Sequence, residues 1–308
     1  MASNLKQMSP KSSNIAKVLM ALAIILFIVV SISIMLKVRQ DFSLKPVIAV
    51  IPVHGEIGIN SEADPIAITK LIQKADKELT VRAIIIDINS PGGSAVGSKQ
   101  IADAIKLAEK PTVALIREVG ASGALWIATS ADRVVADPVS ITGSIGVTAS
   151  YVSFENLMQK YGITYNRLVT GELKDAGTPY KELTPQEREY IMKKITIIKD
   201  IFVQAIAENR NLPVKTVSEL ADGGIWLGSE AQAYGIVDIL GGEKEAQKTA
   251  EQLAGITESR LLRLEEKRPP LFELLSGGTN SIAYWIGKGI AATFIEASNN
   301  QRMPQMDV

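Results

Sequence analysis

An uninterrupted apolar run near the N-terminus restricts this chain more than any other feature of its sequence. Residues Val18–Leu36 read VLMALAIILFIVVSISIML and contain no charged side chain. A helix rises about 1.5 Å per residue, so a run of this length nearly spans the ~30 Å hydrocarbon core of a bilayer. Because no polar face interrupts the run, we expect a membrane helix and not a buried helix of a soluble core.

Positive charges flank the apolar run on both sides. They are Lys6, Lys11, Lys17, Lys37 and Arg39. This near balance favours only slightly a cytoplasmic N-terminus, residues 1–17. A cleaved signal peptide would have a shorter apolar region followed by a small-residue cleavage site, whereas this run ends in Ser-Ile-Met-Leu-Lys-Val. We therefore expect a retained anchor over residues 18–36 and a linker over residues 37–46.

The composition excludes several kinds of functional site. Lys and Arg together number 33, as do Asp and Glu, so the formal net charge is zero and gives no electrostatic reason to expect a nucleic-acid partner. The absence of cysteine excludes disulfides, thiolate metal sites and a cysteine nucleophile. The single histidine, His54, excludes a zinc site built from several imidazoles and leaves only carboxylate-rich sites. We assign no metal and no cofactor.

Apolar runs rich in Val and Ile alternate with helical patterns after residue 46. The strand candidates are Val47–Val53, Ala83–Ile88, Thr112–Arg117 and Arg133–Asp137. The helix candidates are Asp64–Glu78, Ser94–Glu109, Gly120–Thr129, Thr184–Arg210, Ser229–Tyr234 and Glu243–Leu253. Continuous apolar strands between helices are typical of a parallel sheet that is covered on both faces. We therefore predict one α/β domain over residues 47–255.

The tail, residues 256–308, contains the apolar segments LFELL and SIAYWIGKGIAATF. Lys288 and several glycines interrupt the second segment, so we predict an amphipathic helix used for packing or association. A second membrane span is the alternative that these interruptions disfavour.

Two glycine-containing turns follow successive predicted strands. Ser90-Pro91-Gly92-Gly93 comes where a strand ends and a helix begins, and its glycines free backbone N–H groups to form an oxyanion hole. Ser122, within Gly120–Ala124, has the same position after the next strand, at the N-terminus of a helix. Pro-Gly-Gly alone is more often a plain turn, and a lone serine there is more often a helix cap. Neighbouring parallel strands end at one edge of a sheet, so the ordered pair favours a shared catalytic crevice.

Residue patterns alone do not identify the catalytic base. His54 ends the first strand and can reach the crevice, but an ordinary strand-end turn explains it equally well. A lysine serves as a base only when neutral, which requires lowering its pKa from ~10.4 by several units through burial. Such a shift costs roughly 3–5 kcal/mol, so the site must be desolvated and hydrogen-bonded. Spacing does not select one lysine from the candidates.

Five motifs together resemble a known family, signal peptide peptidase A in its short bacterial and archaeal form. The motifs are Asn89–Gly93 (NSPGG), Ala121–Gly123 (ASG), Ala131–Pro138 (ADRVVADP), Thr142–Val147 (TGSIGV) and Lys174–Pro185 (KDAGTPYKELTP). The resemblance covers about Val47 to Leu253. It implies the fold shared by Clp peptidase and crotonases, a repeated ββα core, here behind an N-terminal transmembrane helix.

The resemblance also implies the catalytic roles. Ser122 is the nucleophile that forms an acyl-enzyme, and Lys174 is the general base. Ser144 orients the lysine amine by a hydrogen bond, and the N–H groups of Gly93 and Gly123 form the oxyanion hole. A serine–lysine dyad agrees with the lack of a useful histidine.

The implied function is that of a membrane-anchored serine endopeptidase. It would degrade remnant signal peptides and other membrane-associated or unfolded peptides, with its catalytic domain outside the cytoplasm and beside the bilayer. The implied assembly is a homo-oligomer, an octamer by resemblance. An acyl-CoA hydratase of the same fold is one rival, but it would give no reason for a nucleophilic serine or an anchor. A proteolytically inactive membrane scaffold is the other.

Two residues and one segment within or next to these motifs are given no catalytic role. Asp175 is expected to cap its local turn and not to enter the chemistry. Lys181, also in a loop, serves as the comparison for a lysine that is merely solvated. The segment Ala124–Trp126 departs from the glycine and tyrosines that are frequent after the family's nucleophile, which puts substrate preference in question more than catalysis.

Overall fold

The computed structural model describes residues 11–41 and 45–265. Its first element is α1 (Lys11–Asp41), so the helix continues past residue 36 into the segment predicted as a linker. Within α1, residues Lys17–Met35 have a mean hydropathy of 3.1 and are the one stretch of the described chain that is long and apolar enough to cross a membrane. A membrane anchor and a signal sequence both have this length and hydropathy.

A single eight-stranded sheet organises the chain after α1. Its strands are β1 (Val47–His54), β2 (Val81–Ser90), β3 (Thr112–Ala121), β4 (Arg133–Ala136), β5 (Ile141–Gly143), β6 (Ile225–Leu227), β7 (Ile239–Leu240) and β8 (Arg260–Arg263). The main path has the order β6-β5-β3-β2-β1-β8, and β4 lies between β3 and β7. Every pairing is parallel except that of β5 with β6.

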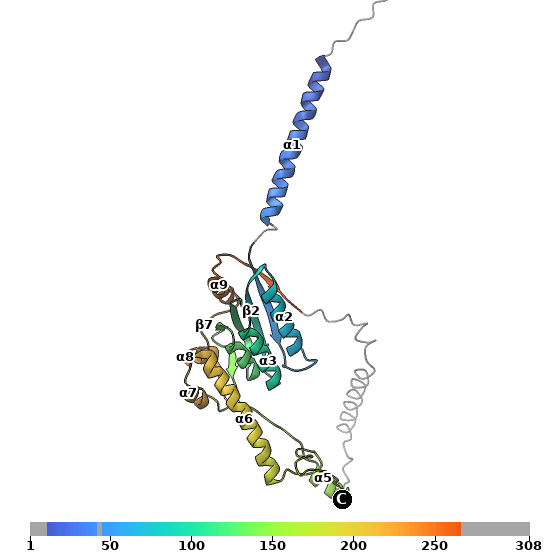
Figure 1. The fold of residues 1–308 in the computed structure, drawn as a ribbon, viewed down its shortest axis with the longest axis vertical. Helices are drawn as coiled ribbons and strands as arrows, with labels where there is room; N and C mark the ends of the chain where they lie inside the picture. The colour runs from blue at the N-terminus through green and yellow to red at the C-terminus, as the bar shows by residue number, and fades with distance from the viewer. Residues whose placement is uncertain (1–10, 42–44, 266–308) are drawn as a thin grey trace, which may run out of the picture. The chain divides into compact units, whose positions relative to one another are not determined.

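Helices cover both faces of the sheet, as its continuous apolar strands require. One face packs against α2 (Pro65–Lys77), α3 (Ala95–Lys106) and α4 (Gly123–Thr129) in the larger core. The other face packs against α9 (Glu243–Leu253), and Figure 1 shows α9 on the side opposite to α2 and α3. The predicted α/β architecture is therefore confirmed.

The strand β3 pairs with two different strands along one edge. Residues Val113–Ile116 pair with β4, and residues Val119–Ala121 pair with β5. Between these pairings, the hydroxyl of Ser140 donates a hydrogen bond to the carbonyl of Arg117. Because β3 continues beyond β4, it carries the chain to the carboxyl edge of the sheet and delivers Ser122 beside β5.

The long helix α6 (Pro185–Arg210) has two unlike halves. Thr184 begins it with a capping box, because its hydroxyl accepts from the Glu187 N–H while the Glu187 carboxylate accepts from the Thr184 N–H. The second half packs on the core, where Phe202 stacks on Trp126 with ring centroids 5.0 Å apart. In the first half, Glu187 alone is buried.

We call residues 148–199 the arm: the segment 148–184, with α5 (Glu155–Lys160), and the first half of α6. Figure 1 shows α6 leading from the helices beside the sheet to the segment that contains α5. Within the described chain, the hydrogen bonds of residues 148–184 stay inside that segment or reach the first turn of α6. Many of the arm's apolar side chains are exposed: Tyr151, Val152, Phe154, Leu157, Tyr161, Ile163, Tyr165, Leu168, Val169, Tyr180, Tyr190, Met192 and Ile197.

Several elements differ from the sequence prediction. The sheet does not end at residue 255, because β8 pairs with β1 within the segment predicted as a helical tail. The short elements α5, α7 (Val214–Glu219), β5, β6 and β7 carry too few residues for a periodic pattern. Predicted helix α8 (Gly228–Ala233) is present. The rest of the predicted tail helix, residues 266–308, lies outside the described residues.

Candidate active site

Ser122 lies at the junction between β3 and α4 with an unusual backbone conformation. Its φ of 53° and ψ of −124° belong to a region that non-glycine residues rarely occupy. Its side chain makes no capping hydrogen bond to α4, although its position is that of the helix cap. The residue is partly exposed, and its hydroxyl is not used by the helix. A plain cap therefore does not account for Ser122.

The backbone of Ile57 holds the Gly92–Gly93 loop in place. The Ile57 N–H donates to the Gly92 carbonyl at 2.9 Å, and the Ser94 N–H donates to the Ile57 carbonyl at 2.8 Å. These bonds use the groups on either side of Gly93 and leave its own N–H free to point elsewhere. Gly93 has a φ of 149°, and a Cβ atom there would overlap the Ile57 carbonyl oxygen. Only glycine fits this position without a backbone shift.

The amides of Gly93 and Gly123 approach each other beside Ser122. A Cβ atom on Gly123 would lie 3.6 Å from the Gly93 nitrogen. A Cβ atom on Gly92 would lie 2.8 Å from the Gly123 nitrogen and 2.9 Å from the Cβ of Ser122. Across the described ranges, neither the Gly93 nor the Gly123 N–H donates a hydrogen bond to protein. Two free donors thus flank the serine, which is the geometry that stabilises an oxyanion.

Ser98 of α3 makes this close approach possible, and sequence reasoning missed it. Ser98 is fully buried, its hydroxyl donates to the Ser94 carbonyl at 2.9 Å, and it occupies the space that a Cβ atom on Gly123 would need. Ser94, Gly97 and Ser98 share one helical face at spacings of three and four residues. That stripe of small residues after the Gly-Gly turn was the available signal.

Ser144 lies directly beside Ser122, although the two are far apart in sequence. The Ser122 N–H donates to the Gly143 carbonyl at 2.9 Å, and Ala121 pairs with Gly143 in the β3–β5 register. Ser144 then leaves the strand with a φ of 55°, and its N–H donates to the Gly224 carbonyl at 2.6 Å. The structure therefore gathers the predicted Gly93, Gly123 and both serines at one edge of the sheet.

Lys174 lies on the arm and is not joined to these residues. It sits in a turn where its N–H donates to the Gly171 carbonyl at 3.1 Å, and its side chain is exposed. Within the described residues, its ammonium forms no hydrogen bond or ion pair, and the hydroxyls of Ser122 and Ser144 form no hydrogen bond either. The single chain thus holds four of the five predicted site residues together.

His54 belongs to a charged cluster on the α9 side of the sheet. Its Nε2 lies 3.7 Å from the carboxylate of Asp87, which is 2% exposed. Asp87 also accepts from Arg117 Nε at 2.5 Å and from Arg263 Nη1 at 3.1 Å, and both arginines bind Glu243. Hydrogen bonds from Arg117 and then Arg263 hold the pKa of Glu243 below its ordinary value. These contacts tie α9 and β8 to β2 and β3, and they explain His54 without a catalytic role.

One sequence interpretation on the arm is wrong, and the structure adds contacts to another. Lys181 is not a solvated lysine, because its side chain is 18% exposed and its Nζ lies 2.5 Å from Glu187 Oε1. Asp175 does more than cap its turn, since its carboxylate binds Arg167 Nε at 2.5 Å and Nη2 at 2.8 Å. Lys181 is therefore unsuitable as a neutral comparison for Lys174.

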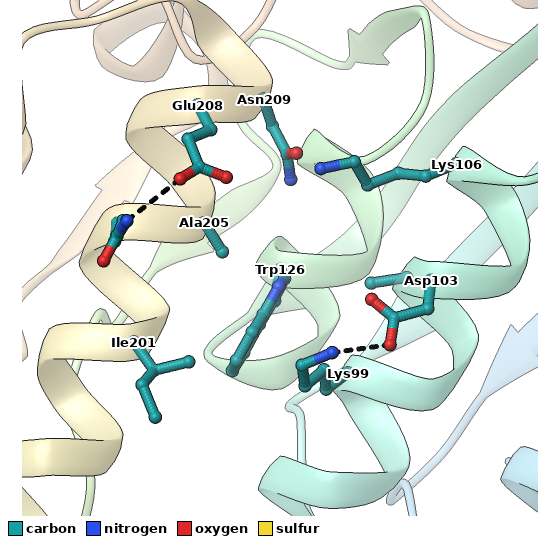
Figure 2. A pocket seen from close by; sticks show the side chains of 10 residues that line it. Lys99, Asp103, Lys106, Trp126, Ile201, Ala205, Glu208 and Asn209 are labelled. Atoms are coloured by element: carbon teal, nitrogen blue, oxygen red, sulfur yellow. Dashed lines mark hydrogen bonds and ion pairs between the residues drawn. The ribbon is translucent and has the colours of Figure 1, made fainter.

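A small pocket lies between α3, α4 and α6, one helical turn beyond the Ser122 junction. Its cavity volume is about 240 Å³, and Figure 2 shows Trp126 at its base between Ile201 and the Lys99–Asp103 ion pair. Trp126, part of the departure from the family pattern, is 5% exposed and packs on Phe202. The departure at Trp126 thus has a packing explanation.

The fold and the paired loops define a class of protein. A partly exposed serine at a strand–helix junction, with two free amides beside it at the carboxyl edge of a parallel sheet, is an arrangement suited to acyl transfer. The architecture is that of the Clp peptidase and crotonase type.

Comparison with known proteins agrees with this class. The model of peptidase family S49 matches residues 104–257. A candidate protease of Methanocaldococcus jannaschii is 35% identical over 224 residues, covering 71% of this chain and 70% of that protein. Protease 4 of Haemophilus influenzae is 33% identical over 222 residues, covering 70% of this chain. A candidate signal peptide peptidase of Enterococcus faecium is 29% identical over 225 residues, covering 72% of this chain and 64% of that protein.

The chain belongs to peptidase family S49. The predicted resemblance to signal peptide peptidase A is therefore confirmed. The matched region covers 70% of the Methanocaldococcus jannaschii protein but only 36% of Protease 4 from Haemophilus influenzae, so these relatives differ in length outside it.

Proposed function

We propose that this protein is a serine peptidase in which Ser122 attacks the peptide carbonyl and forms an acyl-enzyme. The observation that carries the proposal is the pair of free N–H groups, on Gly93 and Gly123, beside a serine whose hydroxyl is not used by the helix it caps. Preorganised donors at the developing oxyanion contribute several kcal/mol to acyl transfer.

We further propose Lys174 as the general base and Ser144 as the residue that orients its amine. The support is the position of Ser144 next to Ser122 and the engagement of the single histidine, His54, with Asp87. Among the described residues of a single chain, the Lys174 side chain has no hydrogen-bond or ion-pair partner. We therefore propose that assembly of several copies brings Lys174 of one copy to Ser122 of a neighbour.

The arm supplies a reason for such assembly. Its exposed apolar side chains, among them Leu157 and Leu168, form the kind of surface that isolated soluble domains rarely leave uncovered. A second copy of the chain is the occupant that would also complete the site. Leu157→Asp should therefore reduce both the oligomer size and the peptidase activity while the monomer remains folded, as measured by light scattering, circular dichroism and substrate turnover.

The substrates we propose are remnant signal peptides and other membrane-associated peptides. The support is α1, because a retained anchor would raise the concentration of membrane-released peptides near the site. In this arrangement, the catalytic domain lies outside the cytoplasm, beside the bilayer. Cysteine introduced into the domain of a Cys-less chain, and probed with an impermeant maleimide on intact cells, tests that topology.

The decisive experiment uses the full-length chain in detergent with casein and a synthetic signal peptide. Ser122→Ala and Lys174→Ala should each lower kcat by roughly 10⁴-fold or more. Lys160→Ala is the matched control, because Lys160 is an exposed lysine of the same arm whose side chain forms no hydrogen bond in the described region. Normal cleavage by Lys174→Ala would refute the dyad.

The alternative function is a proteolytically inactive membrane scaffold. The observation that favours it is the exposed Lys174 side chain, which has no bonded partner in the part of the chain that the structure describes. A fluorophosphonate probe separates the two functions, because a peptidase should be labelled at Ser122 and a scaffold should not. An inert assembled protein that resists the probe would favour the scaffold.

A further inference from the structure

The turn that carries Lys174 is short and is closed by its own backbone. The Lys174 N–H donates to the backbone carbonyl of Gly171 at 3.1 Å, and the Thr178 N–H donates to the backbone carbonyl of Asp175 at 3.0 Å. Turns of this kind fix the local direction of the chain but not the placement of the whole turn. Something outside the turn must therefore hold Lys174 in a defined position.

Arg167 binds this turn on both sides of Lys174. Its Nη2 donates to the Glu172 carbonyl at 3.0 Å. Its Nε and Nη2 donate to the two carboxylate oxygens of Asp175 at 2.5 and 2.8 Å. A guanidinium that grips a carboxylate with two N–H groups fixes orientation as well as distance. Since Glu172 and Asp175 bracket Lys174, one side chain sets the position of the segment between them.

A second connection joins the same carboxylate to α6. Lys181 Nζ lies 3.8 Å from Asp175 Oδ1 and 2.5 Å from Glu187 Oε1. Glu187 is 3% exposed and belongs to the capping box of α6 with Thr184. The turn is thus connected through Asp175 and Lys181 to the start of a long helix whose far end packs on the core.

The Arg167 side chain is 37% exposed, and an ion pair with an exposed partner contributes little to overall stability. The arrangement of these contacts around Lys174 is better explained by a requirement for position. A general base must reach the nucleophile with near-ångström accuracy, and a misplacement of about 1 Å costs on the order of 100-fold in rate. The described part of the arm offers no large buried cluster around Lys174 that would supply this accuracy.

We propose that Arg167 is a positioning residue for Lys174, acting through Asp175 and the Glu172 carbonyl. This inference rests on the proposed role of Lys174 as the base. Arg167 itself does not touch the substrate or the serine in this scheme. Lys181 also helps to position Lys174, but less directly, because it links Asp175 to Glu187 in the capping box of α6.

The test compares Arg167→Met, Arg167→Lys and Arg167→Ala with Arg188→Met in the full-length assembled protein. Arg188 is an exposed arginine of the same arm whose side chain forms no hydrogen bond within the described chain. Arg167→Met should lower kcat by about 10- to 100-fold with KM, oligomer size and Tm nearly unchanged. Arg167→Lys should retain part of the activity, and methylguanidinium should partly rescue Arg167→Ala. Arg188→Met should behave as wild type.

The outcomes separate this inference from the proposed function. If Lys174→Ala cleaves normally, Lys174 is not the base, and both the proposed function and the positioning role of Arg167 are overturned. If Lys174→Ala is inactive while Arg167→Met keeps wild-type kcat, the dyad stands and the positioning role is overturned. A loss of activity that follows loss of Tm or of assembly, without rescue by methylguanidinium, assigns Arg167 a structural role and also overturns the inference.

Discussion

The sheet and the arm hold their functional residues by different physical means. At the sheet edge, Ser122 and the amides beside it are fixed by backbone hydrogen bonds and by atoms packed too closely for any residue but glycine at Gly93 and Gly123. On the arm, Lys174 is placed by long charged side chains, with Arg167 the foremost among them. Ser122 and the amides beside it are thus positioned within one chain, whereas the proposed base, Lys174, is exposed and held only through contacts of neighbouring side chains.

The largest effect that separates the two regions is expected from alanine at glycines. Gly93→Ala should lower activity by roughly 100- to 1,000-fold, because its Cβ would overlap the Ile57 carbonyl and displace the proposed oxyanion donor. Gly162→Ala on the arm also requires a positive φ, 67°, but meets no atom within 4 Å. It should cost about 1–2 kcal/mol of local strain and leave turnover intact. Equal losses of kcat in both variants would contradict the comparison.

The next effect contrasts the two halves of α6. Phe202→Ala should reduce the free energy of unfolding by about 3–5 kcal/mol, because it removes a buried ring stacked on Trp126. Ile197→Ala, on the same helix but 52% exposed, should change it by less than about 0.5 kcal/mol in the monomer. Chemical denaturation of the full-length protein in detergent measures both. A large loss with Ile197→Ala would mean that the first half of α6 is buried, either within the folded chain or between copies.

A smaller effect is expected within the arm, where the segment 148–184 meets α6. Thr184→Ala removes the hydroxyl that accepts from the Glu187 N–H, and loss of such a cap costs about 1 kcal/mol. Hydrogen exchange should accelerate in the first turn of α6 and not in β1, β2 or β3. Thr196→Ala is the control, because its hydroxyl only bonds back to the Met192 carbonyl within the same helix. Faster exchange throughout the sheet would show that arm and core unfold together.

The difference between the sheet and the arm also explains which parts of the structure could be predicted from the sequence. Elements with strong periodicity and long apolar runs, such as β1 and α9, were predicted almost to the residue because burial alone determines them. The edge strand β8 was missed because its pattern RLLR is too short to be distinguished from a turn of helix. The serine–glycine half of the site followed from turns after successive strands, while Lys174 and Ser144 required a resemblance to a family.

Long-range pairing explains the remaining errors. The sequence interprets Lys181 as a solvated loop lysine, and only the fold brings Glu187 to it. Likewise, nothing local reveals that Arg167 reaches Asp175, since no periodic element places the two on one face. Ion pairs between irregular segments carry no sequence period, so such networks become visible only in three dimensions.

The smallest expected effect is a pH dependence confined to the arm. The hydrogen bond from Lys181, followed by that from the Thr184 N–H, holds the pKa of Glu187 below its ordinary 4.5. A carboxyl whose pKa is lowered by folding stabilises the folded state above about pH 4.5 and loses that contribution as pH falls through the lowered value. Protection of the first α6 turn from hydrogen exchange, after correction for the intrinsic rate, should therefore decline below about pH 4.5.

Glu187→Gln tests the cause of that decline. Glutamine can still accept from the Thr184 N–H, so the capping box survives while the charge that pairs with Lys181 is lost. The variant should show slightly lower protection at pH 7 and no further decline over the acid range. If the variant retains the wild-type pH dependence, another carboxyl, first of all Asp175, governs the acid sensitivity of the arm.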